Sequence, residues 1–252
     1  MSHHIIEIND LKYAYPDGTR ALSGISLRIV HGESVAIIGA NGAGKSTLLA
    51  HLVGILTPAA GTVRVGDYPL QPGNKKIIAY IRRAVGMVFQ NPDDQLFMPT
   101  VFDDVAFGPL NLGLPPEEVE QRAMTALATV GAAHLKDRPP YKLSGGQKRA
   151  VAIASVLAMA PDILVLDEPS SDLDPRSRRH LITLLKSFTH TKIIATHDLD
   201  MVMDLCGRTV VLKEGAIFAD KPTMSILTDE KLLAECGLEK PLRLQGPPGP
   251  TA

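Results

Sequence analysis

The chain has 252 residues, of which 45% are hydrophobic and 21% charged, a composition typical of a globular protein with one large α/β domain or a core plus a lobe. Its 26 basic and 27 acidic residues give a net charge of −1, so we expect no nucleic-acid partner. The longest uncharged apolar run, Ala150 to Ala160, falls short of the ~20 residues that span a bilayer. No hydrophobic stretch follows Met1, so we expect no signal peptide, and any link to a membrane would need a partner.

The first predicted elements are strands. Residues 5–8 alternate as a strand does, and residues 22–30 read as a half-exposed antiparallel strand. Tyr15 stands just before a Pro-Asp-Gly turn, where its ring could stack on a nucleotide base or simply pack within a strand, and the local sequence leaves both open. For His3 and His4 we prefer a frayed terminus to a metal site.

A glycine-rich loop follows the buried strand predicted at residues 34–38 and precedes a helix predicted at residues 46–53. The loop matches G-x-x-x-x-G-K-[ST], which in this context predicts a phosphate cradle. Its backbone N–H groups and the positive end of the helix dipole would hold an anion. A plain βα turn would need neither the lysine nor the hydroxyl. The loop residues are Gly39, Ala40, Asn41, Gly42, Ala43, Gly44, Lys45, Ser46 and Thr47.

The middle of the chain is predicted to be largely helical. A strand at residues 62–65, a loop at 67–74 and a core strand at 85–89, ending at Gln90, precede an inserted helical lobe at residues 91–160. Within the lobe, apolar periodicity predicts helices at 101–110 and 117–130. A third helix would begin at Ser144 as N-cap, followed by two glycines that favour close approach of another group to the backbone. That helix start is Leu143, Ser144, Gly145, Gly146 and Gln147.

The last part of the chain alternates apolar strands with helices. The strand at residues 163–166 is apolar on both faces, as in a central parallel strand, and it ends in Asp167 and Glu168 at the edge where α/β ligands bind. A helix capped around Asp174 would run through residue 188, and a core strand at 193–196 ends at His197. Further predictions are a hairpin at residues 209–218, short helices near residues 224 and 232, and a disordered Pro/Gly-rich end. Cys206 and Cys236 form no metal or redox motif, which fits a reduced, cytoplasmic setting.

Together these stretches resemble the ATP-binding-cassette (ABC) family of ATPases over nearly the whole chain. In chain order, the resemblance rests on a Walker A loop (39–47), a Q-loop at Gln90, a signature sequence (143–147), Walker B with a catalytic glutamate (163–168), a D-loop (171–174) and a switch histidine, His197. It implies an α/β P-loop NTPase core of the RecA type, with an antiparallel β-subdomain and the helical lobe. We expect an ABC ATPase domain at residues 1–236, with C-terminal helices at about 222–236, and a flexible tail at 237–252.

The resemblance also implies roles for the site residues, with ATP as substrate and Mg²⁺ as cofactor. Lys45 and the loop amides would hold the phosphates, and Tyr15 would stack on the base. Ser46, Asp167 and Gln90 would be the Mg²⁺ ligands, and Gln90 could also position the attacking water. Glu168 would take a proton from that water, and His197 would donate to the γ-phosphate.

The residues 90–97 and 105–109 are similar to those of ATPases from energy-coupling-factor importers, most of all the cobalt/nickel type (CbiO). This implies a homodimer at the cytoplasmic face of the membrane, beside a transmembrane coupling protein and a metal-binding membrane component. The chain itself would not bind the transported ion. The signature helix start would meet the ATP of the second copy. The expected docking residues for the membrane partner are Asp93, Asp94, Leu96 and Phe97.

Three other functions remain as alternatives. A vitamin could replace the metal as cargo, because selectivity lies in membrane components. A non-transport ABC protein acting on DNA or the ribosome usually has long coiled coils or two cassettes, and this chain has neither. A P-loop kinase with a small-molecule acceptor would not need the signature sequence.

Overall fold

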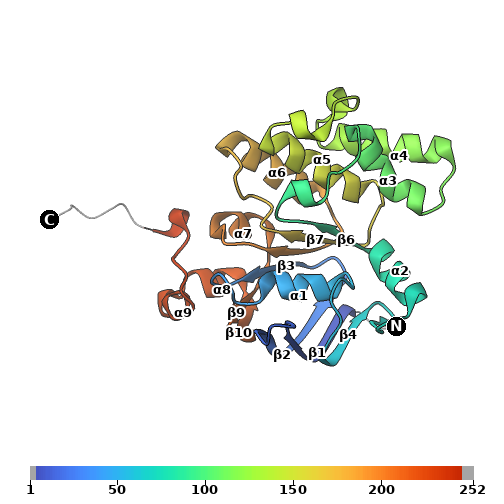
Figure 1. Cartoon of the computed structure of the whole chain (residues 1–252). Helices are drawn as coiled ribbons and strands as arrows, with labels where there is room; N and C mark the ends of the chain where they lie inside the picture. Colours follow the sequence, from blue (N-terminus) through green and yellow to red (C-terminus); the bar gives the residue numbers. More distant parts are fainter. Residues whose placement is uncertain (1–3, 246–252) are drawn as a thin grey trace. The chain divides into compact units, whose positions relative to one another are not determined.

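The computed structural model describes residues 4–245 (Figure 1). The chain divides into two compact units, which are described separately. Unit 1 comprises Met1–Ile81 and Thr191–Ala252, and unit 2 comprises Arg82–His190. The expectations for His3, for the side chain of His4 and for the tail at residues 246–252 lie outside what the structure describes. Within residues 4–245, no helix is both long enough and apolar enough to cross a bilayer.

Unit 1 begins with an antiparallel sheet in the strand order β2-β1-β4-β5. Alternation along β1 places Ile6 and Ile8 in the core, and a register shift after Ile8 turns Leu11 to the same side; none of the three has exposed surface. The three longer strands confirm the predicted ones and extend them, whereas β5 lies inside the segment predicted as a loop. The strands are β1 (His4–Ala14), β2 (Arg20–Val30), β4 (Ala60–Val65) and β5 (Tyr68–Pro69).

The remaining strands of unit 1 follow the order β10-β9-β3-β8. The central strand β3 (Ser34–Ile38) pairs in parallel with β8 (Thr191–Ala195) and β9 (Arg208–Lys213), and β10 (Ala216–Pro222) closes the predicted hairpin. Helix α1 (Lys45–Leu52) lies between β3 and the antiparallel sheet (Figure 1). Its Leu48, Leu49 and Leu52 side chains are buried, as predicted from their spacing.

The C-terminal part of unit 1 is helical. Helix α7 (Leu199–Leu205) follows β8, and α8 (Thr223–Leu227) and α9 (Glu230–Glu235) follow β10, near the two predicted positions. Residues 237–245, where we expected a flexible tail to begin, include a 3₁₀-helix at Leu242–Leu244. Helix α2 (Lys75–Ala84), which leads from unit 1 into unit 2, was not predicted.

Unit 2 combines two parallel strands with four α-helices among its described residues. The strands β6 (Val85–Val88) and β7 (Ile163–Asp167) pair in register, with Val88 opposite Leu166. Helix α5 packs against β6 on one side and against α3 and α4 on the other. Val151, Ala152 and Ile153 of α5 are buried, so the unit has its core around this helix. The helices are α3 (Val101–Asn111), α4 (Pro116–Thr129), α5 (Gly145–Leu157) and α6 (Pro175–Ser187).

Candidate functional site

The glycine loop of unit 1 has a backbone that other residues could not follow. Gly44 caps α1 with φ of 100°, and a Cβ built there would lie 2.6 Å from the carbonyl oxygen of Ala21. A Cβ on Gly39 would overlap the carbonyl oxygen of Leu212. No side chain caps this helix start and no acid occupies its first turn, so its N–H groups face the loop without competition from a side-chain oxygen. An anion fits this loop.

Lys45 supplies the charge at the centre of the loop. Its side chain is only 8% exposed, and Nζ donates to the carbonyl oxygens of Gly39 (2.8 Å) and Ala40 (3.2 Å). An ammonium has three protons to donate, and a buried cation needs compensating charge or hydrogen bonds. Two neutral carbonyls supply only part of that compensation, so the loop suits a ligand with several negative charges.

Tyr15 and His197 lie around the same loop. Tyr15 Oη is 2.9 Å from Oγ1 of Thr47 in the first turn of α1, and 38% of Tyr15 is exposed. In the parallel pair of β3 and β8, Ile37 is opposite Ala195. Gly39 and His197 each follow two residues later, so both leave the sheet at its carboxyl edge. Unit 1 therefore brings together the predicted phosphate loop, base-stacking ring and switch histidine.

Unit 2 brings together Gln90, Asp167 and Glu168 in the same manner. Because Val88 is opposite Leu166, Gln90 and Glu168 each come two residues beyond a registered pair. Asp167 and Glu168 are 5% and 6% exposed. Glu168 has φ of 44°, a left-handed conformation that costs an ordinary residue about 1–3 kcal/mol. Such conformations cluster at functional sites, so this backbone supports a working role for the carboxylate.

The start of α5 is closed by a capping box. Ser144 Oγ accepts from the Gln147 N–H (3.3 Å), and the Gln147 side chain accepts from the Ser144 N–H (3.0 Å), so the predicted N-cap is confirmed. The two glycines differ in their surroundings. A Cβ on Gly146 would lie 2.9 Å from Ser177 Oγ of α6, whereas Gly145 faces open space. Gly146 thus allows close packing inside unit 2, and Gly145 leaves room for a group from outside.

This helix start opens onto a basic hollow of 620 Å³ between α5 and α6. Among the residues that line the hollow there are five basic side chains and no aspartate or glutamate. The three arginines among them give the hollow positive charge, which suits an anionic group. The basic side chains are His134, Arg149, Arg176, Arg179 and His180.

Arg149 is a buried residue that the sequence analysis missed. It is 4% exposed and donates to the carbonyl oxygens of Phe89 (2.7 Å) and Gln90 (2.6 Å). Burial lowers the pKa of its guanidinium, and the charges of Asp172 and Asp167 oppose that shift. Arg149 therefore fixes α5 to the backbone at Gln90.

Gln95 makes a second link between the same two segments. Its Nε2 donates to Ala152 O (2.7 Å) and to Ser155 Oγ (3.0 Å) of α5, while its Oε1 accepts from the N–H of Phe89 (3.2 Å). With Arg149, it makes residues 89–95 and α5 one connected body.

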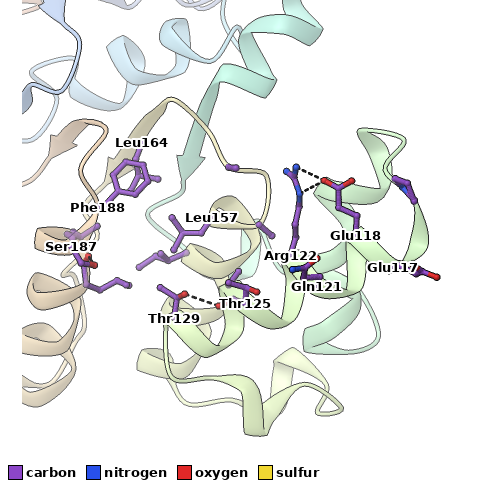
Figure 2. Close-up of a pocket in the computed structure, with 17 residues that line it drawn as sticks. Glu117, Glu118, Gln121, Arg122, Thr125, Thr129, Leu157, Leu164, Ser187 and Phe188 are labelled. Carbon is purple, nitrogen blue, oxygen red and sulfur yellow. Dashed lines mark hydrogen bonds and ion pairs between the residues drawn. The ribbon is translucent and has the colours of Figure 1, made fainter.

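Unit 2 also has a larger cavity, of 830 Å³, which Figure 2 shows between α4, α5 and α6. Its lining includes Leu157, Leu164 and Phe188, and on the opposite side of the view Arg122 pairs with Glu118 at 2.7 Å. None of the predicted site residues lines this cavity. This cavity is therefore separate from the residues of the predicted nucleotide site.

A buried lysine in a glycine loop at a helix start, with carboxylates at the end of a core strand, defines an α/β protein that binds the phosphates of a nucleotide. A model of the family described as "ABC transporter" matches residues 22–171. The chain belongs to the ABC transporter family and is an ATPase of the ABC type, with the α/β nucleotide-binding fold of these proteins.

Two curated relatives illustrate the match. The chain is 64% identical over 248 residues to a protein of Geobacter sulfurreducens described in general terms as an ABC transporter ATP-binding protein, covering 98% of both chains. It is 48% identical over 240 residues to the energy-coupling factor transporter ATP-binding protein EcfA of Methanothermobacter thermautotrophicus, covering 94% of this chain and 77% of that protein.

Solved structures agree with the fold. CbiO1 of Clostridium perfringens, described as part of the ABC transporter complex CbiONQ, matches with a TM-score of 0.81 and 41% identity, over 93% of this chain and 94% of that chain. An ATP-binding cassette solved as a dimer in a post-hydrolysis state with ADP and Pi matches with a TM-score of 0.78 and 28% identity, over 86% of this chain and 98% of that chain.

Proposed function

We propose that this protein is the ATP-hydrolysing subunit of an energy-coupling-factor importer that takes up a transition-metal ion, cobalt or nickel. The similarity to EcfA and to CbiO1 over more than nine-tenths of the chain carries the proposal. The protein would work at the cytoplasmic face of the membrane beside a transmembrane coupling protein and a metal-binding component. Vitamin uptake is the second candidate, since transporters of this class can share an ATPase design while their membrane components select the cargo.

In this proposal ATP lies on the glycine loop. Lys45 turns from the loop carbonyls to the β- and γ-phosphates, and the amides at the start of α1 hold the remaining oxygens. Tyr15 stacks on the adenine ring. The buried, partly compensated ammonium of Lys45 supports this role.

The donor set also fits Mg²⁺. Within residues 4–245, no three His, Cys, Asp or Glu side chains form a cage for a metal ion. Mg²⁺ usually needs only one or two protein carboxylates or hydroxyls, with water and substrate phosphates completing its octahedron. Ser46, Asp167 and Gln90 supply a hydroxyl, a carboxylate and an amide oxygen for this purpose. When bound, the ion would neutralise charge on the β- and γ-phosphates.

Glu168 acts as the general base in this proposal. The oxygen of a water molecule attacks the γ-phosphorus, its proton passes to Glu168, and the bond to the ADP oxygen breaks, which leaves ADP and phosphate. His197 donates to the γ-phosphate as charge builds up on it. The left-handed backbone and burial of Glu168 support its role.

We further propose that two copies pair, so that the start of α5 in one meets the ATP of the other. Gly145 faces open space, and the hollow beside Ser144 and Gln147 is lined by basic side chains. Both features suit contact with a phosphate group of the ATP that is bound to the second copy. The similarity to a cassette solved as a dimer supports the same arrangement.

The docking surface for the membrane partner is proposed on α3 and on the segment that precedes it. Leu96, which we expected there, is 7% exposed and belongs to the core, and Asp93 pairs with Lys148 of α5 at 2.6 Å. Phe97 and Phe107 are 64% and 40% exposed, with ring centres 5.1 Å apart. An exposed aromatic pair of this kind suits a helix of a membrane protein.

Uptake measurements test the importer assignment. A host strain that lacks the protein should lose cobalt or nickel uptake, the gene for the native chain should restore it, and Lys45→Ala should not. Charge reversal of Asp93 and Asp94 should weaken assembly with the membrane partner. If metal uptake is unchanged but uptake of one vitamin is lost, the vitamin assignment replaces the metal one.

A further inference from the structure

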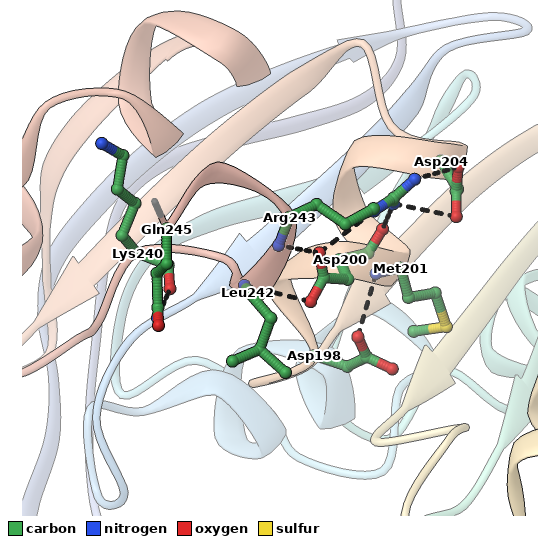
Figure 3. A network of polar contacts seen from close by, with 8 residues as sticks. All are labelled: Asp198, Asp200, Met201, Asp204, Lys240, Leu242, Arg243 and Gln245. Atoms are coloured by element: carbon green, nitrogen blue, oxygen red, sulfur yellow. Dashed lines mark hydrogen bonds and ion pairs between the residues drawn. The ribbon is translucent and has the colours of Figure 1, made fainter. Parts of the chain in front are cut away.

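The last described residues of unit 1 form a segment that runs along its surface. We call residues 237–245 the C-terminal strap. It begins beside the glycine loop, where a Cβ on Gly237 would lie 3.7 Å from Cβ of Ala40. It ends on α7, the helix that follows His197 (Figure 3). The strap therefore touches both sides of the proposed nucleotide site in unit 1.

Arg243 attaches the strap to α7 (Figure 3). Its Nε is 3.1 Å from Asp200 Oδ1, its Nη2 is 3.0 Å from Asp204 Oδ2, and Nη2 also donates to the carbonyl oxygen of Asp200. The backbone N–H groups of Leu242 and Arg243 donate to the two oxygens of Asp200, each at 3.2 Å. One carboxylate thus receives three donors from the strap.

Helix α7 needs such an attachment. It has seven residues, and helices this short are marginal without external contacts. Asp200 and Asp204 are four residues apart on the same face, so their like charges repel, and Asp204 also lies at the negative end of the helix dipole. Arg243 contacts both carboxylates, so its single positive charge reduces the repulsion between them. The bonds to Asp204 and Asp200 raise the pKa of its guanidinium.

Helix α7 is joined to His197 through Asp198. Asp198 caps α7 by accepting from the N–H of Met201 (2.9 Å), and its own N–H donates to Thr196 Oγ1 (3.0 Å). His197 stands between these two anchored residues, at the end of β8. A shift of α7 would therefore displace Asp198 and act directly on His197 beside it.

We infer that the C-terminal strap positions the switch histidine: Arg243, by clamping Asp200 and Asp204, holds α7 and with it His197 in the geometry used for hydrolysis. This inference rests on the role proposed for His197. Arg243 is a positioning residue here, because it reaches the γ-phosphate only through α7.

The test compares Arg243→Ala with Arg243→Lys and with Lys240→Ala. Lys240, three residues before Arg243 in the strap, pairs with Glu230 of α9 at 2.8 Å, so its variant removes an ion pair without touching α7. We expect Arg243→Ala to lower kcat for ATP about tenfold with unchanged KM, because small misplacements of a reacting group cost rate rather than binding. Arg243→Lys should recover part of the loss, and Lys240→Ala should match the native chain.

A double-mutant cycle separates this inference from the proposed function. Arg243→Ala should have no further effect in a His197→Ala background, and hydrogen exchange of the α7 amides should quicken about tenfold in Arg243→Ala. Equal losses in both backgrounds, or unchanged exchange, would overturn the strap inference. A His197→Ala variant with native turnover would instead overturn the role of the histidine, while the exchange measurement would still report on the clamp.

Discussion

Replacing Arg149 by leucine should destabilise the protein by about 3 kcal/mol. The change removes two charge-assisted hydrogen bonds, to Phe89 O and Gln90 O, and leaves both carbonyls without these donors. Losing one such hydrogen bond lowers the free energy of unfolding by about 1.5–3 kcal/mol, so losing both lowers it by about 3–6 kcal/mol. Leucine avoids the desolvation of a buried cation, which offsets part of that cost. With an m-value of about 2 kcal/mol/M, the urea midpoint should fall by about 1.5 M.

Lys148→Met is the matched control for this prediction. Lys148 precedes Arg149 in the same helix turn, but its ion pair joins Asp93, whose side chain is 61% exposed, and such pairs contribute about 0–1 kcal/mol. The chain has no tryptophan, so unfolding is best followed by circular dichroism at 222 nm. If Arg149→Leu and Lys148→Met shift the midpoint equally, Arg149 does not hold residues 89–90 to α5 in the way described.

Four further outcomes are expected. Glu168→Gln should keep ATP binding and lower turnover about 10²–10³-fold, as loss of one transition-state group does; near-native ATPase rates would disprove its role as base. Lys45→Ala should weaken ATP binding itself, which isothermal titration can measure. Burial lowers the pKa of His51 below 6.5, so the unfolded chain takes up a proton that the folded chain excludes. The free energy of unfolding should therefore fall as pH drops through 6.5, and by less in His51→Phe. Burial raises the pKa of Cys206 to about 12, so a thiol reagent at pH 8 should label it only after unfolding.

The predictable parts of the fold were those with local signals. The strand before Gly39, the glycine loop and the helix after it each follow from neighbouring residues, and so does the capping of α5 by Ser144. Helix α2 was not predicted, although Ile77, Ile78 and Ile81 have helical spacing. The glycines and prolines of the preceding loop favoured a prediction of irregular structure there.

The parts that could not be predicted depend on distant partners. Arg149 bonds to carbonyls about sixty positions earlier, and no spacing in the sequence marks a backbone acceptor. Leu96 follows three polar residues and looked exposed, yet it packs into the core while Phe97 beside it faces outward. Position 146 requires glycine because Ser177 of another helix lies where a side chain would be.

The parallel register of β6 and β7 restricts how this protein can change over evolutionary time. Successive side chains of a strand point to opposite faces, so losing one residue from β7 would turn Glu168 away from its present direction while Gln90 stayed in place. Insertions between helices can be absorbed by loops, but the number of residues from Val88 to Gln90 and from Leu166 to Glu168 must change together or not at all. Insertions and deletions in proteins that descend from this chain should therefore occur outside these two short stretches.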